Sequence, residues 1–158
     1  MDAIALLKND HVTVKALLTE LEGTTPRAIK KRTELVDKIR IELKAHTTIE
    51  EEIFYPAFKS HGENGDDDKM YFEALEEHRA AGEFVLPDLL GTAVESEKFS
   101  GRAKVLKELV VHHASEEEKE MFPRARKLLG KDELKALAEQ MGARKAQLVK
   151  ELRAAPRA

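Results

Sequence analysis

Two stretches of the chain, HTTIEEEIFYP at residues 46–56 and HASEEEKEMFP at residues 113–123, share one pattern. Each begins with a histidine, carries a glutamate four residues later, and ends in an apolar pair followed by proline. Corresponding positions lie 67 residues apart, and a further histidine precedes each stretch at the same offset, at His11 and His78. This spacing indicates an internal duplication of one helical hairpin.

Apolar residues around the two stretches recur every three or four positions, which is the spacing of an amphipathic helix. Such stripes occupy residues 4–21, 36–53, 71–89 and 103–121. No window alternates with the period of two that a strand requires, and Pro56 and Pro123 interrupt the second and fourth stripes. We therefore predict an all-α, up-down antiparallel four-helix bundle over residues 1–129, with residues 130–158 as a C-terminal helix and tail packed on the same domain.

Composition excludes several classes of protein. A chain of 158 residues with a formal net charge of -3 has the length of one domain and no excess of positive charge for nucleic acid or an anionic membrane. The absence of cysteine excludes disulfides, zinc–thiolate sites and iron–sulfur clusters. No run of 18 apolar residues occurs, and the start MDAIALLKNDH has too short an apolar run for a signal peptide. We expect a cytoplasmic protein.

The duplication also places polar residues inside the apolar stripes, at equivalent positions in both halves. The six residues are His11, His46, Glu50, His78, His113 and Glu117. A lone histidine on an apolar helix face is usually an ordinary core residue. Burial of imidazole and carboxylate groups costs several kcal/mol unless they are paired or bind a metal, so two equivalent sets of three predict a metal site.

The number and spacing of these groups favour a pair of ions. His46 and Glu50 lie four residues apart and therefore on one helix face, as do His113 and Glu117. We predict that each carboxylate bridges two ions and that each ion takes two imidazoles. An oxo or hydroxo bridge would then leave one open position per ion for a small molecule. Imidazole and carboxylate suit iron, manganese or zinc, and a bridged pair with open positions suits iron best, with zinc as an alternative occupant.

The pattern His…HxxxE…His…HxxxE, with an aromatic residue and proline after each HxxxE, resembles the haemerythrin-like (HHE cation-binding) domain from residue 2 to about 129. The resemblance implies a non-haem di-iron centre that binds or reacts with dioxygen, peroxide or nitric oxide. Oxygen-carrying haemerythrins have two histidines four apart on the third helix, whereas Ala74 and Gly82 flank His78 here. Their last carboxylate follows its histidine by five residues instead of four. These departures favour the bacterial branch of the family, to which sensing, peroxide removal and iron handling are attributed.

Two functions follow from this expectation. The first is a di-iron protein that binds dioxygen or decomposes hydrogen peroxide in a catalase-like cycle. The alternative is a non-catalytic protein that stores or senses iron, oxygen or nitric oxide. Tyr55, whose counterpart in the other half is Phe122, either reaches the metals and donates a proton or plugs the end of the bundle.

Several polar residues lie next to these six in the sequence. Asp10 and Glu77 each precede a lone histidine by one residue, about 100° away on the helix, and are expected at the surface. Glu51 and Glu118 either orient imidazoles or are solvated, and the solvated state is favoured for Glu118. His112 begins another HxxxE pattern but lies outside the duplicated register, so we expect it at the surface or behind a ligand.

Overall fold

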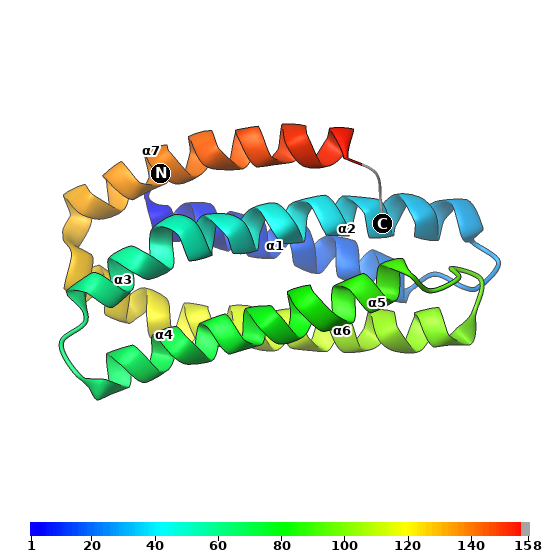
Figure 1. Cartoon of the computed structure of the whole chain (residues 1–158), viewed down its shortest axis with the longest axis horizontal. Coiled ribbons are helices and arrows are strands. Elements are labelled where there is room, and N and C mark those ends of the chain that lie inside the picture. Colours follow the sequence, from blue (N-terminus) through cyan, green and yellow to red (C-terminus); the bar gives the residue numbers. More distant parts are fainter. Residues whose placement is uncertain (156–158) are drawn as a thin grey trace.

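The structure is a computed structural model that describes residues 1–155, and helices dominate it (Figure 1). The π-helical segments are labelled η. The elements are α1 (Ala3–Glu22), α2 (Ile29–Ile49), η1 (Glu50–Phe54), α3 (Tyr55–His61), α4 (Gly65–His78), η2 (Arg79–Val85), α5 (Leu86–Leu90), α6 (Glu97–Glu116), η3 (Glu117–Met121) and α7 (Phe122–Ala154). Residues 1–155 contain no strand, so the predicted all-α class is confirmed.

Consecutive elements join into four long rods that run in alternate directions along the bundle (Figure 1). These rods are α1, α2 with η1 and α3, α4 with η2 and α5, and α6 with η3 and the first residues of α7. Gly130 has φ 77° and ψ 168°, a conformation that glycine adopts without strain, and it breaks α7 into two helical parts. The remainder of α7 runs along α1 and α2 as the additional C-terminal helix. Residues 156–158 of the predicted tail lie outside the described residues.

Three helices begin with a side chain that accepts a backbone N–H. Asp2 caps α1 by accepting from Ala5 at 2.8 Å, and Asn64 caps α4 by accepting from Asp67 at 2.9 Å. Ser96 accepts from Phe99 in the same way at the start of α6. These caps satisfy N–H groups that the first helical turn leaves without partners, and they fix where three of the four rods begin.

π-helical turns accommodate Pro56 and Pro123, where the sequence predicts interruptions of the helices, and also Pro87. Pro56, Pro87 and Pro123 each stand second in the α-helix that follows a π segment. Proline has no N–H to donate, and its ring clashes with the carbonyl four residues earlier, so a wider turn relieves both conflicts. The rods therefore continue through these positions. Because η1 and η3 lie 67 residues apart, this local geometry is duplicated with the sequence.

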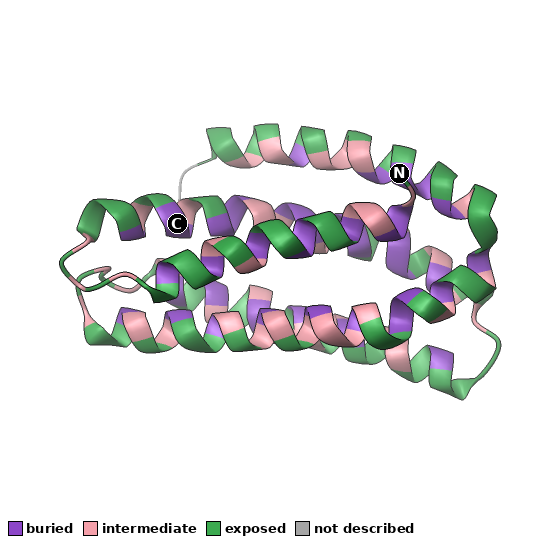
Figure 2. Cartoon of the chain, turned by 180° about the vertical axis from the view of Figure 1, so that it is seen from behind, coloured by how far each residue is buried: buried purple, intermediate pink, exposed green. Residues whose placement is uncertain are grey.

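Two apolar clusters fill the bundle on either side of the buried polar residues. One contains Ile4, Leu7, Ile49, Phe54, Phe58, Phe122, Leu134 and Met141, and the other contains Val14, Leu18, Ile39, Leu86, Leu89, Phe99 and Leu106. Figure 2 shows the buried bands mostly on the faces that the helices turn toward one another. Along α1, His11 lies between Leu7 of the first cluster and Val14 of the second. None of the helices in residues 1–155 combines the length and apolar content of a membrane span.

Candidate metal centre

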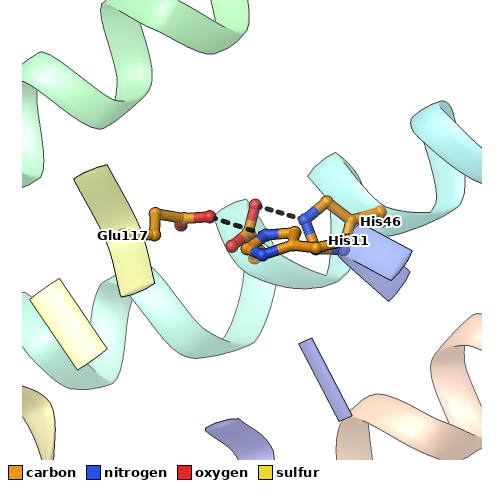
Figure 3. Close-up of side chains that lie close together, drawn as sticks. His11, His46 and Glu117 are labelled. Carbon is orange, nitrogen blue, oxygen red and sulfur yellow. Dashed lines mark hydrogen bonds and ion pairs between the residues drawn. The ribbon is translucent and has the colours of Figure 1, made fainter. Parts of the chain in front are cut away.

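The six residues of the duplicated pattern come together in the middle of the bundle. They are contributed by α1 (His11), α2 (His46), η1 (Glu50), α4 (His78), α6 (His113) and η3 (Glu117). Figure 3 shows His11, His46 and Glu117 pointing toward one another from three different rods. Their potential ligand atoms form two groups, each with all atoms within 4.8 Å of one another: His11, His46, Glu50 and Glu117, and Glu50, His78 and His113.

Each buried carboxylate lies between one histidine from each half of the chain. Glu50 Oε1 is 3.1 Å from His46 Nε2 and 3.0 Å from His78 Nε2. Glu117 Oε1 is 3.1 Å from His11 Nε2 and 3.4 Å from His113 Nε2. Glu50 is 0% and Glu117 2% exposed, so water does not solvate these charges. The arrangement has the approximate two-fold relation that the 67-residue repeat predicts.

The acids that precede the lone histidines contact the imidazoles of neighbouring helices. His46 Nδ1 is 2.8 Å from Asp10 Oδ2, and His113 Nδ1 is 2.6 Å from Glu77 Oε1. The expectation of surface positions was wrong: Asp10 is 4% exposed and Glu77 is half-buried. Each acid is rotated by about 100° around its helix from the histidine that faces the centre. It therefore points at the adjacent helix, where it contacts an imidazole.

The glutamates that follow the buried carboxylates, Glu51 and Glu118, contact the other two imidazoles through their Nδ1 atoms. His78 Nδ1 is 2.8 Å from Glu51 Oε2, and His11 Nδ1 is 2.6 Å from Glu118 Oε2. The favoured expectation that Glu118 is only solvated was therefore wrong. In all four imidazoles Nε2 faces the centre while Nδ1 meets a carboxylate, an arrangement that fixes the ring orientation and makes Nε2 a stronger ligand.

Tyr55 is buried beside the second group. Its hydroxyl donates to Glu117 Oε2 at 2.7 Å and lies 3.1 Å from the Nε2 atoms of His78 and His113. Burial and the nearby charges of Glu117 and Glu50 raise the pKa of Tyr55 well above its usual value, so the phenol keeps its proton. Phe122, its counterpart in the other half, instead stacks on the His11 ring at 5.8 Å.

The electrostatics of the centre favour a bound cation. Burial disfavours charge at Glu50, but the positive charge of His46 lowers the Glu50 pKa well below its usual value. Burial and the negative charge of Glu50 raise the pKa of Glu117, so the two carboxylates repel each other. Among residues 1–155, His46 Nε2 and Glu50 Oε2 are buried without a hydrogen-bond partner, although the His46 nitrogen is 3.1 Å from the other Glu50 oxygen. These two orphaned atoms and the imidazole–carboxylate donor set fit a metal ion.

A small cavity adjoins the four imidazoles. Its volume is about 30 Å³, which is enough for a molecule of a few heavy atoms. Its lining includes the four histidines of the centre together with aliphatic residues, among them Val14, Leu43, Ala81, Leu109 and Val110. The surface that these residues present to the cavity is apolar, so it suits a small uncharged molecule beside the imidazoles.

The two histidines outside the duplicated register lie away from the centre. His112 is 62% exposed on α6, as expected for a surface residue. His61 is exposed in α3, where its Nε2 is 3.2 Å from Glu133 Oε2. π-helical turns at the buried glutamates were not expected from the sequence, although the proline six residues after each glutamate was a usable signal.

Comparisons with known proteins show the same fold and a cation-binding family. The model of the Hemerythrin HHE cation binding domain matches residues 2–125. The uncharacterised protein Rv2633c of Mycobacterium tuberculosis is 30% identical over 157 residues, which cover 99% of this chain and 90% of that protein. The crystal structure of an Rv2633c homologue from Mycobacterium kansasii, described as a Hemerythrin HHE cation binding domain-containing protein, superimposes with a TM-score of 0.82 at 29% identity, covering 96% of this chain and 89% of that one.

A protein of Nostoc sp. named DNA nickase is 28% identical over 148 residues. The match covers 93% of this chain but spans only about 40% of the length of that relative. The family match extends over most of the chain and includes all six residues of the centre. The chain therefore belongs to the hemerythrin family of HHE cation-binding domains.

Proposed function

We propose that this metal-binding domain holds two iron ions, joined by an oxo or hydroxo bridge, and decomposes hydrogen peroxide in a catalase-like reaction. The main support for this proposal is that two groups of buried ligand atoms share Glu50, and that Glu117 contacts a histidine of each group. A shared carboxylate between two sets of imidazoles is the arrangement that a bridged metal pair requires. The nitrogen-rich donor set favours iron over magnesium or calcium.

The protein's contribution would be geometry, exclusion of water and control of one proton. The two irons, when bound, would supply the electron exchange by which one peroxide molecule is oxidised to dioxygen and another is reduced to water. Asp10, Glu51, Glu77 and Glu118 hold the four imidazoles through their Nδ1 atoms, so the Nε2 atoms need little reorganisation. The centre is thereby preorganised for its ions.

Tyr55 is the group best placed to hold or move a proton. Its hydroxyl lies within 3.1 Å of two imidazole nitrogens and donates to Glu117, so it can exchange that proton with a small molecule in the centre. A bound cation would favour loss of the proton, and Tyr55 would then bind the metal as phenolate. The cavity of about 30 Å³ supports a substrate with few heavy atoms, such as peroxide, dioxygen or nitric oxide.

An oxygen electrode tests this proposal. After reconstitution with Fe²⁺ in air, the wild-type protein should contain iron and release dioxygen when hydrogen peroxide is added. Glu50→Ala should lose this activity because both groups use Glu50, whereas His61→Ala, at an exposed histidine in α3, should retain it. A reversible spectral change under dioxygen without turnover of peroxide would reject the catalase-like reaction in favour of a binding, storage or sensing protein.

A further inference from the structure

A second His-x-x-x-Glu pair lies outside the buried centre. His112 and Glu116 precede His113 and Glu117 by one residue each, which turns them to the outer face of α6. Glu77 faces them from α4. The Nε2 atom of His112 is 3.3 Å from Glu116 Oε1 and 3.4 Å from Glu77 Oε2. Ligand atoms of all three residues lie within 4.8 Å of one another.

These separations suit a shared cation better than direct hydrogen bonds. Metal–ligand bonds of about 2.0–2.2 Å in a tetrahedral site put neighbouring ligand atoms roughly 3.3–3.5 Å apart. Charge-assisted hydrogen bonds between nitrogen and carboxylate oxygen are shorter, at about 2.7–2.9 Å. The His112 ring forms no hydrogen bond with another residue of the described chain, whereas His61 Nδ1 lies 2.9 Å from the carbonyl oxygen of Ala57.

The equivalent face in the other half of the duplication is apolar. His112 corresponds to Ala45 and Glu116 to Ile49, and both of these are fully buried in the cluster that includes residues of α7. The C-terminal helix thus covers the first half of the bundle and leaves the second half open. Solubility alone would require only a face of mixed charge at the open positions.

Two further acids extend this open face. Glu73 corresponds to Leu6 and Glu120 to Ile53, and these two apolar counterparts pack against the covered core. Glu73 shares a hydrogen bond with Glu116, and this contact raises the pKa of Glu73. The four open positions therefore carry three carboxyl groups and one imidazole, with no lysine or arginine among them.

The outer residues are continuous with the buried centre. A small hollow between α4 and the α6–η3 rod is lined by Glu73, Glu77 and Glu116 together with His113 and Glu117 of the centre. Glu77 connects the outer residues with the buried centre, because its Oε1 is 2.6 Å from His113 Nδ1 while its Oε2 faces His112. A cation held by Glu77 would consequently sit one residue away from a proposed ligand of the metal pair.

We propose that Glu77, His112 and Glu116 form an outer site for a divalent first-row transition ion, with water completing its coordination. One nitrogen and two or more oxygen ligands suit Zn²⁺, Fe²⁺ or Mn²⁺. The existence of the site does not depend on the function of the buried centre. Its influence on that centre, through Glu77 and His113, rests on the proposed di-iron function.

Calorimetric titration of the iron-loaded protein with Zn²⁺ tests the site. The wild type should bind one Zn²⁺ per chain beyond its resident metal. His112→Ala and Glu116→Gln should each weaken this binding at least about tenfold, because each removes one of three protein ligands. His61→Ala is the matched control, since it removes another exposed histidine that lies beside a glutamate. It should leave Zn²⁺ binding unchanged.

Absence of the extra Zn²⁺ in the wild type would overturn the outer site, as would equal affinity in the His112→Ala and His61→Ala variants. Metal analysis before titration separates this outcome from failure of the di-iron proposal. If iron is absent but the wild type still binds one Zn²⁺ more than His112→Ala, the outer site stands and the di-iron function fails. A Zn²⁺-dependent change in the visible spectrum of the iron, lost in His112→Ala, is expected if Glu77 transmits its effect to His113.

Discussion

Replacement of Lys145 by methionine should destabilise the protein through the buried centre. Lys145 lies on α7, and its Nζ is 2.5 Å from Asp10 Oδ1 and 3.3 Å from Glu42 Oε2. The other oxygen of Asp10 meets His46 Nδ1. The C-terminal helix is therefore linked to the proposed ligand His46 through the Lys145–Asp10 ion pair. We propose that this helix and residues 1–129 form a single folding unit.

The expected magnitude follows from burial. Asp10 is 4% exposed, so loss of the ammonium leaves a buried carboxylate whose remaining partner is His46 Nδ1. Breaking a fully buried pair costs about 3–5 kcal/mol, but Lys145 is 24% exposed, and solvent screening reduces the cost to about 1–3 kcal/mol. For a chain of this length, that corresponds to a fall in Tm of roughly 3–10 °C. Methionine keeps most of the aliphatic stem, so little packing is lost.

Urea denaturation of four variants measures this contribution. Lys150→Met changes an exposed lysine on the same helix and should alter the free energy of unfolding by less than about 0.5 kcal/mol. Asp10→Asn and the double variant with Lys145→Met complete a mutant cycle, in which we expect a coupling energy of at least about 0.5 kcal/mol. Equal stability of Lys145→Met and Lys150→Met, or strict additivity in the cycle, would refute the reasoning.

Three other predictions concern the metal and the pH. Glu50→Ala should remove more iron than His46→Ala, because Glu50 belongs to both ligand groups, and His61→Ala should remove none; metal analysis of purified variants measures this. Chelation of the metal should lower Tm, by the equivalent of about 4 kcal/mol if free metal had been at a thousandfold excess over Kd, as scanning calorimetry would show. Arg124 lowers the pKa of Asp67 to about 2. The stability that this interaction adds is present above the unfolded pKa near 4 and is lost as the pH falls toward 2. Asp67→Asn should therefore lower Tm by roughly 2–4 °C at pH 7, and this deficit should disappear near pH 2. A deficit that stays constant with pH would contradict the prediction.

The duplicated spacing was enough to predict which residues of the centre would meet. His46 and Glu50 share a helix face whatever the packing, and antiparallel hairpins bring the equivalent face of the second half to the same depth. The lone histidines at His11 and His78 followed because buried polar groups in equivalent positions need a shared partner. Both the all-α bundle and the convergence of these residues could therefore be predicted from periodicity and offset alone.

The roles of the surrounding acids depended on contacts between helices, which a single helix does not specify. Asp10 turns away from the seam of α1 and meets an imidazole of α2, and Glu118 likewise meets His11 across the bundle. The π-helical turns reflect a conflict between proline and the regular hydrogen-bond ladder. Sequence periodicity detects only where that conflict occurs, because relief by a kink or by a wider turn depends on the packing of neighbouring rods.

The central claim is that this bundle holds two adjacent ions between the duplicated imidazoles and carboxylates. Iron content per folded chain, measured together with the electron paramagnetic resonance spectrum of the oxidised protein, tests it most directly. We expect about two irons per chain and no signal from isolated ferric ions, because a bridge couples the two spins. One iron per chain with the signal of an isolated ferric ion would contradict the claim.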